Sequence, residues 1–236
     1  MERRVRRMNL KKLVTAAVCT MLMAAVAFTA GCGGEKKSDK KVLKVGMECA
    51  YAPYNWSQTK ADGGAVKIAG SNEYAYGYDV MMAKKLADSM GADLEIHKIE
   101  WDGLAPAVVS GKIDAAIAGM SITSKRKETV DFTKPYYYAT VVALVKKDSE
   151  QAKAQSVASV ATSQLNTIWY DQIDQVPDVK KLPAIDTVPG MIVALTSGKC
   201  NLIVTDIPTA KAAAFANPEL TVLNFEEEKG FKTSRE

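Results

Sequence analysis

Few residues of this 236-residue sequence have the types and spacing that catalysis requires. The sole histidine, His97, lies between Ile96 and Lys98 in a stretch that alternates like a strand, so we expect a surface or packing role for it. The sequence contains no nucleophile elbow, no glycine-rich phosphate loop and no Cys/His spacing typical of a metal site. It therefore favours binding over catalysis, with neither cofactor nor metal.

Two stretches resemble each other and would bring candidate binding residues to one place. The stretch 107–119 (AVVSGKIDAAIAG) returns in altered form at 194–206 (ALTSGKCNLIVTD). Each copy predicts a helix end, a Ser-Gly-Lys turn with a left-handed glycine, and a short buried strand. Ligands of open α/β sheets lie beyond the carboxyl ends of strands, so residues 118–121 and 205–206 should face a shared cleft. The alternative is that Ser-Gly-Lys is simply a common helix-to-strand turn.

The elements that must position these residues alternate between strand and helix. This alternation predicts an α/β fold with a mostly parallel sheet and helices on both faces. Expected strands are 42–47, 94–99, 113–118, 157–161 and 220–223, with a short strand that ends the second copy within 194–206 and a β-branched run at 140–145 that follows the crossover. Expected helices are 79–90, one opening at 101–103, one from about 167, and 208–216. An aromatic loop at 48–56 and a polar loop to about residue 76 separate the first strand from the first helix.

The N-terminal residues predict export and a lipid anchor. Six basic side chains precede an uncharged run, Leu13 to Ala30, which indicates a signal peptide over residues 1–31. Ala30 and Gly31 before Cys32 resemble a lipoprotein cleavage site, although Thr29 stands where leucine is usual. We expect Cys32 to be lipidated and residues 32–41 to form a tether. A permanent membrane-spanning helix is the alternative, since 18 residues just suffice.

Charge and cysteine content narrow the function classes further. The net charge of +4 belongs to the leader, because removing residues 1–31 leaves 25 basic and 26 acidic side chains. A mature chain near −1, without a basic stripe, gives no support for a nucleic-acid partner. The remaining 205 residues suffice for two lobes of about 100 residues each. Cys49 and Cys200 fall in different lobes, and we expect both thiols to be unpaired.

Several ordered motifs resemble the family 3 extracellular solute-binding proteins, which are capture subunits of bacterial ABC importers for polar amino acids. They are Ala50-Tyr51-Ala52-Pro53-Tyr54, Gly77-Tyr78-Asp79-Val80, Trp101-Asp102-Gly103-Leu104, Ala118-Gly119-Met120-Ser121 with Arg126, Asp131-Phe132-Thr133 with Pro135-Tyr136-Tyr137, and Val204-Thr205-Asp206. The resemblance covers essentially everything from Val42 onward. It implies two lobes with a periplasmic-binding-protein-like fold of type II, joined by hinge strands. We expect lobe 1 over 42–134, a crossover over 135–141, lobe 2 over 142–224 and a return segment from 225.

The resemblance also implies which residues bind the ligand. Arg126 matches the residue that binds the ligand carboxylate, for which a planar guanidinium is suited, and its alternative is an exposed helix arginine beside Lys125 and Lys127. Asp206 matches the residue that binds the ammonium, and its alternative is an N-cap for the helix at Pro208. Completing the predicted site are the backbone at Ala118 and Gly119, the hydroxyl of Ser121, a donor from Thr167, and the aromatic rings of Tyr51 and Trp101.

Ligand specificity is predicted from two further matches. Glu48 and Gln164 match positions that contact the ligand side chain in relatives. A carboxylate in a closed cleft favours a basic or polar amino acid, because an unpaired buried charge is costly. Glu48 is alternatively a cap for a neighbouring loop.

The resemblance extends to partners and location. It implies a free amino acid and a membrane permease as partners, and a monomer at the bacterial surface or in the periplasm. A dehydratase-like enzyme on the same fold, using Glu48 and Asp206, and a receptor's ligand-sensing domain are the alternatives. Because relatives continue beyond the segment resembling 225–231, we also expect the sequence to be a fragment lacking part of the return to lobe 1.

Overall fold

The structure is a computed structural model that describes residues 40–153 and 159–225. Residues 41–236 group into one compact unit and residues 1–40 into another. The predicted signal peptide, Cys32, nearly all of the tether and residues 226–236 of the predicted return segment lie outside the described residues. The predicted boundary between lobes at 135–141 stays a prediction, because the grouping keeps residues 41–236 together.

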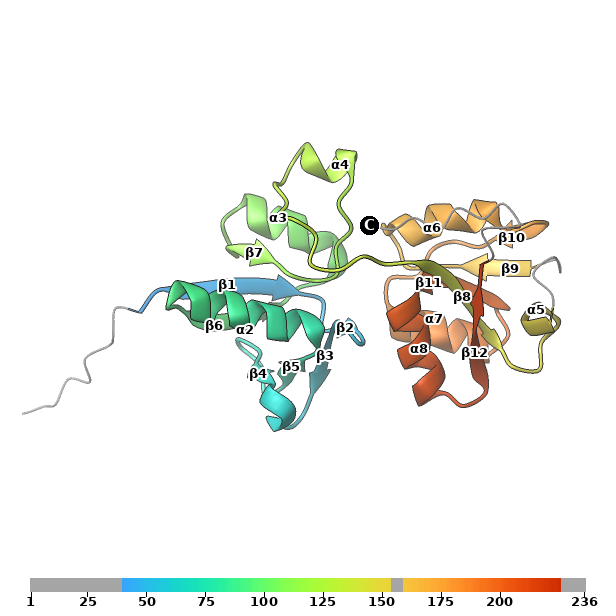
Figure 1. Cartoon of the computed structure of the whole chain (residues 1–236), viewed down its shortest axis with the longest axis horizontal. Helices are drawn as coiled ribbons and strands as arrows, with labels where there is room; N and C mark the ends of the chain where they lie inside the picture. The colour runs from blue at the N-terminus through green and yellow to red at the C-terminus, as the bar shows by residue number, and fades with distance from the viewer. Residues whose placement is uncertain (1–39, 154–158, 226–236) are drawn as a thin grey trace, which may run out of the picture. The chain divides into compact units, whose positions relative to one another are not determined.

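A parallel three-stranded sheet forms the centre of the first lobe. Its order is β6-β1-β7, with β1 (Val42–Met47), β6 (Asp93–Lys98) and β7 (Ala115–Ala116). Helix α2 (Tyr78–Met90) contacts β6 (Figure 1). Its core-facing residues Val80, Ala83 and Ala87 are buried. It ends at Gly91, whose φ of 62° is the left-handed conformation that a helix-terminating glycine supplies. The periodicity of the sequence predicted β1 and α2 correctly.

An antiparallel sheet occupies the region that the sequence predicted as loop. Its order is β2-β3-β5-β4, with β2 (Ala50–Tyr51), β3 (Asn55–Gln58), β4 (Val66–Lys67) and β5 (Tyr74–Tyr76), and a 3-10 turn η1 (Asp62–Gly64). The rings of Trp56 and Tyr76 pack edge to face across β3 and β5, with centroids 5.0 Å apart. Such cross-strand aromatic pairs stabilise short strands that carry no long alternating pattern.

Three short helical elements follow β6 and flank the first copy of the repeat. These are η2 (Trp101–Gly103), α3 (Leu104–Val109) and, after β7, α4 (Ser124–Lys127). Strand β7 is shorter than the predicted 113–118. The carboxylate of Asp114 accepts the Lys44 amide at 2.8 Å, so a side chain replaces a backbone acceptor at the start of this ladder.

The second lobe contains a mixed five-stranded sheet in the order β10-β9-β11-β8-β12. Its strands are β8 (Val141–Lys146), β9 (Ser159–Thr162), β10 (Val179–Lys181), β11 (Leu202–Asp206) and β12 (Leu220–Asn224). Strands β10, β9 and β11 are parallel, whereas β8 is antiparallel to both β11 and β12. The expected parallel pairing therefore holds for these three strands. Strand β8 lies between β11 and β12 and runs opposite to both.

Helices cover both faces of this sheet, as the alternation of elements predicted. On one face Val142 and Leu144 of β8 pack with α7 (Val188–Thr196) and α8 (Ile207–Ala216). On the other face Val141, Ala143 and Val145 pack with α6 (Ile168–Gln172) and η3 (Ile173–Gln175). A further short helix, α5 (Glu150–Lys153), follows β8. A strand buried on both sides must be continuously apolar, as β8 is.

The two copies of the repeated stretch close their helices in the same way. Gly111 and Gly198 have φ values of 72° and 80°, and the following lysine amides donate to the carbonyls of Ala107 at 3.0 Å and Ala194 at 2.9 Å. The copies lead into β7 and β11, which belong to different sheets. The predicted turn chemistry is confirmed at both positions.

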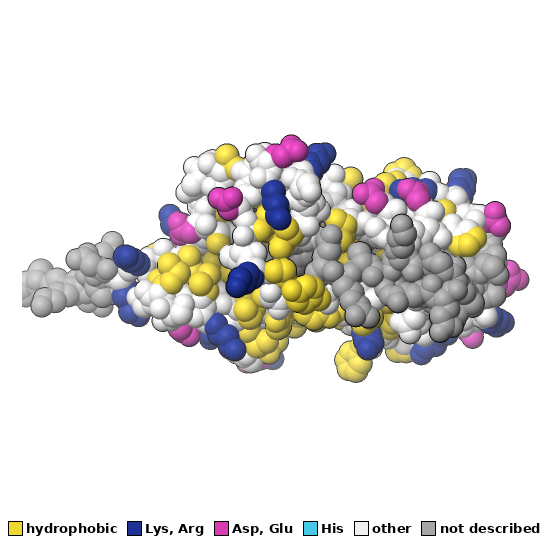
Figure 2. Space-filling view, turned by 45° about the horizontal axis from the view of Figure 1, so that its top comes forward, with side chains coloured by type: hydrophobic (Ala, Val, Ile, Leu, Met, Phe, Trp, Pro, Cys, Tyr) yellow, Lys and Arg dark blue, Asp and Glu magenta, His cyan; other side chains and the backbone are white. Residues whose placement is uncertain are grey.

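Cys49 and Cys200 are buried and unpaired, as expected. Within the described ranges, no helix combines the length and apolarity needed to cross a bilayer. On the face shown in Figure 2, acidic and basic side chains are interspersed among the described residues.

Candidate functional site

Residues from both lobes meet in one small pocket. Those of the first lobe come from β2, η2 and the segment that runs from β7 to α4, and those of the second come from the start of α6. The lining residues are Tyr51, Trp101, Gly119, Ser121, Arg126, Thr167, Ile168 and Trp169. Six of the ten residues predicted from the sequence are among them, whereas Glu48, Gln164, Ala118 and Asp206 are not.

Arg126 turns its guanidinium toward this pocket rather than toward solvent. The helix that carries it, α4, begins after Thr123, whose hydroxyl oxygen accepts the Arg126 amide at 3.2 Å. Lys125 and Lys127 on either side are exposed, while Arg126 is half-buried with its guanidinium carbon 5.5 Å from the centre of the Trp101 ring. Local capping thus directs one of three consecutive basic residues inward, which argues against the surface alternative.

The guanidinium of Arg126 already donates to two backbone carbonyls. Nη1 donates to the carbonyl of Ser121 at 2.6 Å and Nη2 donates to the carbonyl of Asn166 at 2.7 Å. A guanidinium has five N–H donors in a planar fork, so it can also bind a carboxylate, directly or by exchanging one of these carbonyls. The carbonyl of Asn166 belongs to the second lobe, so Arg126 links the two walls.

Asp206 has the N-cap role that was its alternative reading. It ends β11 fully buried, and its carboxylate accepts the Thr209 amide at 2.9 Å and the Thr209 hydroxyl at 3.1 Å. The hydroxyl of Tyr51, from the first lobe, donates to Oδ2 at 2.5 Å. Burial raises the pKa of Asp206, and these hydrogen bonds lower it. Asp206 therefore also connects the lobes, through the aromatic residue that was predicted beside it.

Glu48 and Gln164 form a buried pair across the lobes. Gln164 Nε2 donates to Glu48 Oε2 at 3.0 Å and to the carbonyl of Asp186 at 3.1 Å. The other oxygen, Oε1, is buried and has no hydrogen-bond partner among the described residues. Burial, and less strongly the charge of Glu100, raise the pKa of Glu48 to about 7, although the bond from Gln164 lowers it. A buried carboxylate with few donors is costly as an anion, so a proton or a cation beside it would stabilise it.

The sequence comparison decides the family. Residues 43–182 match the family described as bacterial extracellular solute-binding proteins, family 3. The chain belongs to this family.

Individual relatives of this family 3 protein are amino-acid-binding proteins. A probable histidine-binding protein of Campylobacter jejuni is 32% identical over 180 residues, which are 75% of this chain and 65% of the relative. The ABC transporter arginine-binding protein 1 of Escherichia coli is 28% identical over 214 residues, covering 90% and 78%. Among solved structures, an ancestral amino acid-binding protein described as a precursor of cyclohexadienyl dehydratase has a TM-score of 0.65 and 30% identity, covering 78% of each chain. The fold is therefore that of the two-lobed periplasmic binding proteins of type II.

Of the other predicted residues of the family 3 protein, Ala118 does not line the pocket, whereas Gly119, Thr167 and Trp101 line it with hydrogen-bonding groups that already have partners. Ala118 is buried in the core of the first lobe. Gly119 has a φ of 61°, and its amide donates to the Tyr136 hydroxyl at 2.9 Å rather than into the pocket. Thr167 is the N-cap residue of α6, and its hydroxyl donates to the Gln164 carbonyl at 2.8 Å. Trp101 donates from Nε1 to the carbonyl of Asn166 at 3.3 Å.

Sequence reasoning missed Asn166, on which three residues of the first lobe converge. The backbone carbonyl of Asn166 accepts hydrogen bonds from Trp101 and Arg126, and its side-chain Nδ2 donates to Asp102 Oδ1 at 2.8 Å. It has a φ of 54°, a left-handed conformation that asparagine tolerates better than most residues. An asparagine directly before a helix N-cap threonine was the available signal.

Catalytic and metal-binding groups are sparse in the described part of the family 3 protein. His97 lies in β6 beside Glu95, with Nε2 2.6 Å from the carboxylate, and it is not among the residues that line the pocket. No group of three metal-ligating side chains is placed for a metal ion within the described ranges.

Proposed function

We propose that this family 3 protein captures a cationic amino acid for a bacterial ABC importer. The observation that carries the proposal is a pocket lined by residues of both lobes, with Arg126 in its wall. An arginine in this position supplies the bidentate cation that a desolvated carboxylate needs. The histidine-binding and arginine-binding relatives agree with a basic ligand.

The ligand side chain extends, in this proposal, toward Glu48. The unpaired Oε1 of that residue supports a cationic group at this end, because a cation would compensate the buried charge. Tyr51 and Trp101, which are almost fully buried, supply apolar ring surface for the aliphatic stem. Asp206, which Tyr51 connects to the first lobe, is assigned to the ammonium group.

Capture proceeds by a shift in population between open and closed forms. A ligand stabilises the closed form only by binding it more tightly than the open form. Arg126 belongs to one lobe and Asp206 to the other, so a zwitterion that contacts both gains affinity on closure. The permease then receives the closed, loaded form, and the protein acts as a monomer.

The anchor and location follow from the N-terminal residues. Cleavage before Cys32 and acylation of that cysteine would hold the protein outside the cytoplasm at the membrane, on a tether that ends near residue 41. This assignment is supported by the charge pattern and the small residues at positions 30 and 31, and by the extracellular character of the family.

A thermal-shift screen of the twenty amino acids tests the proposed function. We expect L-arginine, L-lysine or L-histidine to raise the melting temperature, since a ligand at one hundred times its dissociation constant adds about 2.7 kcal/mol of stability. Glutamate is the contrasting ligand, because it would place a second carboxylate beside Glu48. Stabilisation by no amino acid would contradict the proposal. Turnover of a compound in the same samples, seen by mass spectrometry, would favour an enzyme instead.

The role of Arg126 is tested with a matched control. Arg126→Ala should abolish calorimetrically detectable binding of the stabilising amino acid, because the carboxylate loses its charged donor. Lys125→Ala removes an exposed basic residue from the same helical turn and should leave the affinity unchanged. Equal affinities for the two variants would rule out the carboxylate role.

A further inference from the structure

The motif Gly77-Tyr78-Asp79-Val80 contains a buried carboxylate that does not line the ligand pocket. Asp79 lies in the first turn of α2 and has no exposed surface. A buried charge persists only where hydrogen bonds compensate its lost hydration. The partners of Asp79 therefore indicate what the charge is used for.

Both carboxylate oxygens of Asp79 accept hydrogen bonds from other segments of the first lobe and the crossover. Tyr136, in the crossover, donates its hydroxyl to Oδ1 at 2.7 Å, and Asn55 donates Nδ2 to Oδ2 at 2.7 Å. Asn55 in turn accepts the Cys49 amide at 2.7 Å. The carboxylate thus joins strand β3, the residues after β1 and the crossover.

The Tyr136 hydroxyl extends this network to the wall of the ligand pocket. It accepts the amide of Gly119, which lines the pocket, at 2.9 Å. A phenol has one proton, and Asp79 as an anion can only accept, so Tyr136 must donate to Asp79 and is left to accept from Gly119. Burial raises the pKa of Asp79 to about 6 while hydrogen bonds from Tyr136, Asn55 and the Gly119 backbone lower it, so the carboxylate is ionised above that pH. The direction of both bonds is therefore set by the charge.

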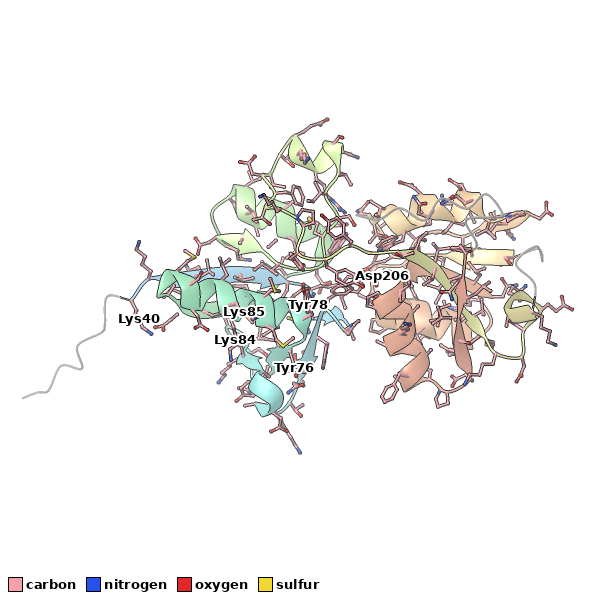
Figure 3. The ribbon with its side chains drawn as sticks, viewed as in Figure 1. Lys40, Tyr76, Tyr78, Lys84, Lys85 and Asp206 are labelled. Atoms are coloured by element: carbon pink, nitrogen blue, oxygen red, sulfur yellow. The ribbon has the colours of Figure 1, made fainter. Side chains whose placement is uncertain are left out.

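Helix α2 holds the same tyrosine at a second point. The Tyr78 hydroxyl donates to the Tyr136 carbonyl at 3.2 Å, so two consecutive residues of α2 bind Tyr136 at opposite ends. Figure 3 shows Tyr78 at the start of this helix. The amides of Tyr78 and Asp79 donate to the carbonyls of Pro53 and Tyr54, at 3.2 and 2.8 Å. The start of α2 therefore also fixes the loop beside Tyr51.

Gly119 needs such a constraint, because its position is tight and its backbone is permissive. Its φ of 61° is a conformation that glycine adopts readily, and a Cβ there would lie 3.0 Å from Tyr51 Cε1. The bond to Tyr136 removes the freedom that glycine would otherwise have. It also occupies the Gly119 amide, so this N–H serves the wall rather than the ligand.

We propose that Asp79 and Tyr136 form a positioning pair, in which the carboxylate orients the tyrosine hydroxyl and the hydroxyl holds Gly119 so that residues 119–121 present their polar groups to the bound amino acid. The expected effect of this pair on amino-acid affinity rests on the proposed function. Its effect on the position of Gly119 does not depend on that function.

Tyr136→Phe tests the pair in the full chain, kept in mild detergent. It deletes one hydroxyl, and we expect hydrogen exchange at the Gly119 amide to accelerate at least about tenfold, as for loss of one buried hydrogen bond. We also expect the dissociation constant for L-arginine to rise about tenfold, without loss of the folded far-ultraviolet spectrum. Tyr138→Phe deletes a hydroxyl from an exposed residue two positions along the same segment, and should change neither value.

Asp79→Asn is the second variant, in case Tyr136→Phe is poorly folded. It removes the charge that sets the direction of the Tyr136 bond but keeps an acceptor oxygen, so Gly119 exchange should accelerate less than in Tyr136→Phe. Unchanged exchange at Gly119 in both variants would overturn the positioning pair, even if the melting temperature falls. If the wild-type chain binds no amino acid, the proposed function fails, and Gly119 exchange still decides the pair.

Discussion

At the scale of single residues, Glu48 is the group whose environment most constrains the ligand. It has one donor, Gln164, for a carboxylate that could accept several, and the donor belongs to the opposite lobe. Burial disfavours the charged form of this carboxyl and raises its pKa to about 7. A cationic ligand would favour the charged form instead. Glu48 thus bears on the proposed ligand class, on the pH dependence of stability and on the contact between the lobes.

Glu48 makes stability depend on pH in a predictable direction. Its pKa is 4.5 when unfolded and about 7 when folded, so between these values the folded state binds more protons. The free energy of unfolding should therefore fall as pH rises from about 4.5 to about 7, by at most about 3 kcal/mol, and level off above. Urea titrations of the ligand-free protein across this range measure it.

Glu48→Gln provides the comparison for this prediction. The variant keeps the shape but does not titrate, so its free energy of unfolding should depend less on pH than that of the wild type. Asp79, with a pKa raised to about 6, contributes the same sign in both proteins and cancels in the difference. Parallel pH profiles would show that Glu48 does not titrate in this window.

At the scale of elements, helix N-termini position much of the pocket. Helices α4, α6 and α8 begin after Thr123, Thr167 and Asp206, and each start places a polar residue at or near the boundary between the lobes. Side-chain acceptors at helix N-caps satisfy amides that the helix itself cannot. Asp206 combines this local role with a hydrogen bond from Tyr51, and its role toward a ligand ammonium stays a prediction.

The two duties of Asp206 can be separated by substitution. Asp206→Asn keeps a good N-cap but removes the charge, so we expect amino-acid binding to weaken by roughly 2 to 5 kcal/mol, as for loss of one partner of a desolvated pair. The thermal stability should change little, since asparagine caps helices about as well as aspartate. Calorimetry with the stabilising amino acid gives the first value and thermal melts the second.

A cap that is unconnected to the pocket is the control for this prediction. Thr187 caps α7, and its hydroxyl oxygen accepts the Gly190 amide at 3.2 Å. Thr187→Ala should cost about 1 kcal/mol of stability and leave the affinity unchanged. If Asp206→Asn loses less than about 0.5 kcal/mol of binding, Asp206 acts as a helix cap alone.

At the scale of the whole molecule, the leader and the folded part carry different information. Residues 1–31 hold the excess of positive charge and the apolar run, and Cys32 follows them directly. The folded part has neither an excess of basic charge nor, in its described residues, a helix suited to spanning a bilayer. We expect attachment through Cys32 to be separable from the proposed binding function.

Cys32→Ser tests this separation. We expect the substitution to move the protein from the membrane fraction to the soluble fraction of the expressing bacterium, because more than one acyl chain is needed for stable anchoring and the serine cannot carry them. Cys49→Ser, at a buried thiol of the first lobe, is the matched control and should leave the distribution unchanged. Retention of the Cys32→Ser variant in the membrane would favour an uncleaved spanning helix.

Local patterns determined several elements before any tertiary contact is considered. The alternation of Val42–Met47, the helical spacing that ends at Gly91 and the Ser-Gly-Lys turns at Gly111 and Gly198 each depend on the conformational preferences of neighbouring residues. These preferences act over a few positions, so the sequence displays them directly. The ordered motifs then sufficed for the family, and six of the ten predicted residues line the pocket.

Only the tertiary structure decided which distant residues meet and in which direction strands pair. Glu48 and Gln164 are 116 positions apart, and Asp79 and Gly119 both form a hydrogen bond with the Tyr136 hydroxyl. The antiparallel sheet at 50–76 and the antiparallel course of β8 depend on partners that no local pattern specifies. Hydrogen bonds between distant segments form only when the whole chain is compact, and in this protein such bonds place the orphaned carboxylate oxygen of Glu48 and the amide of Gly119.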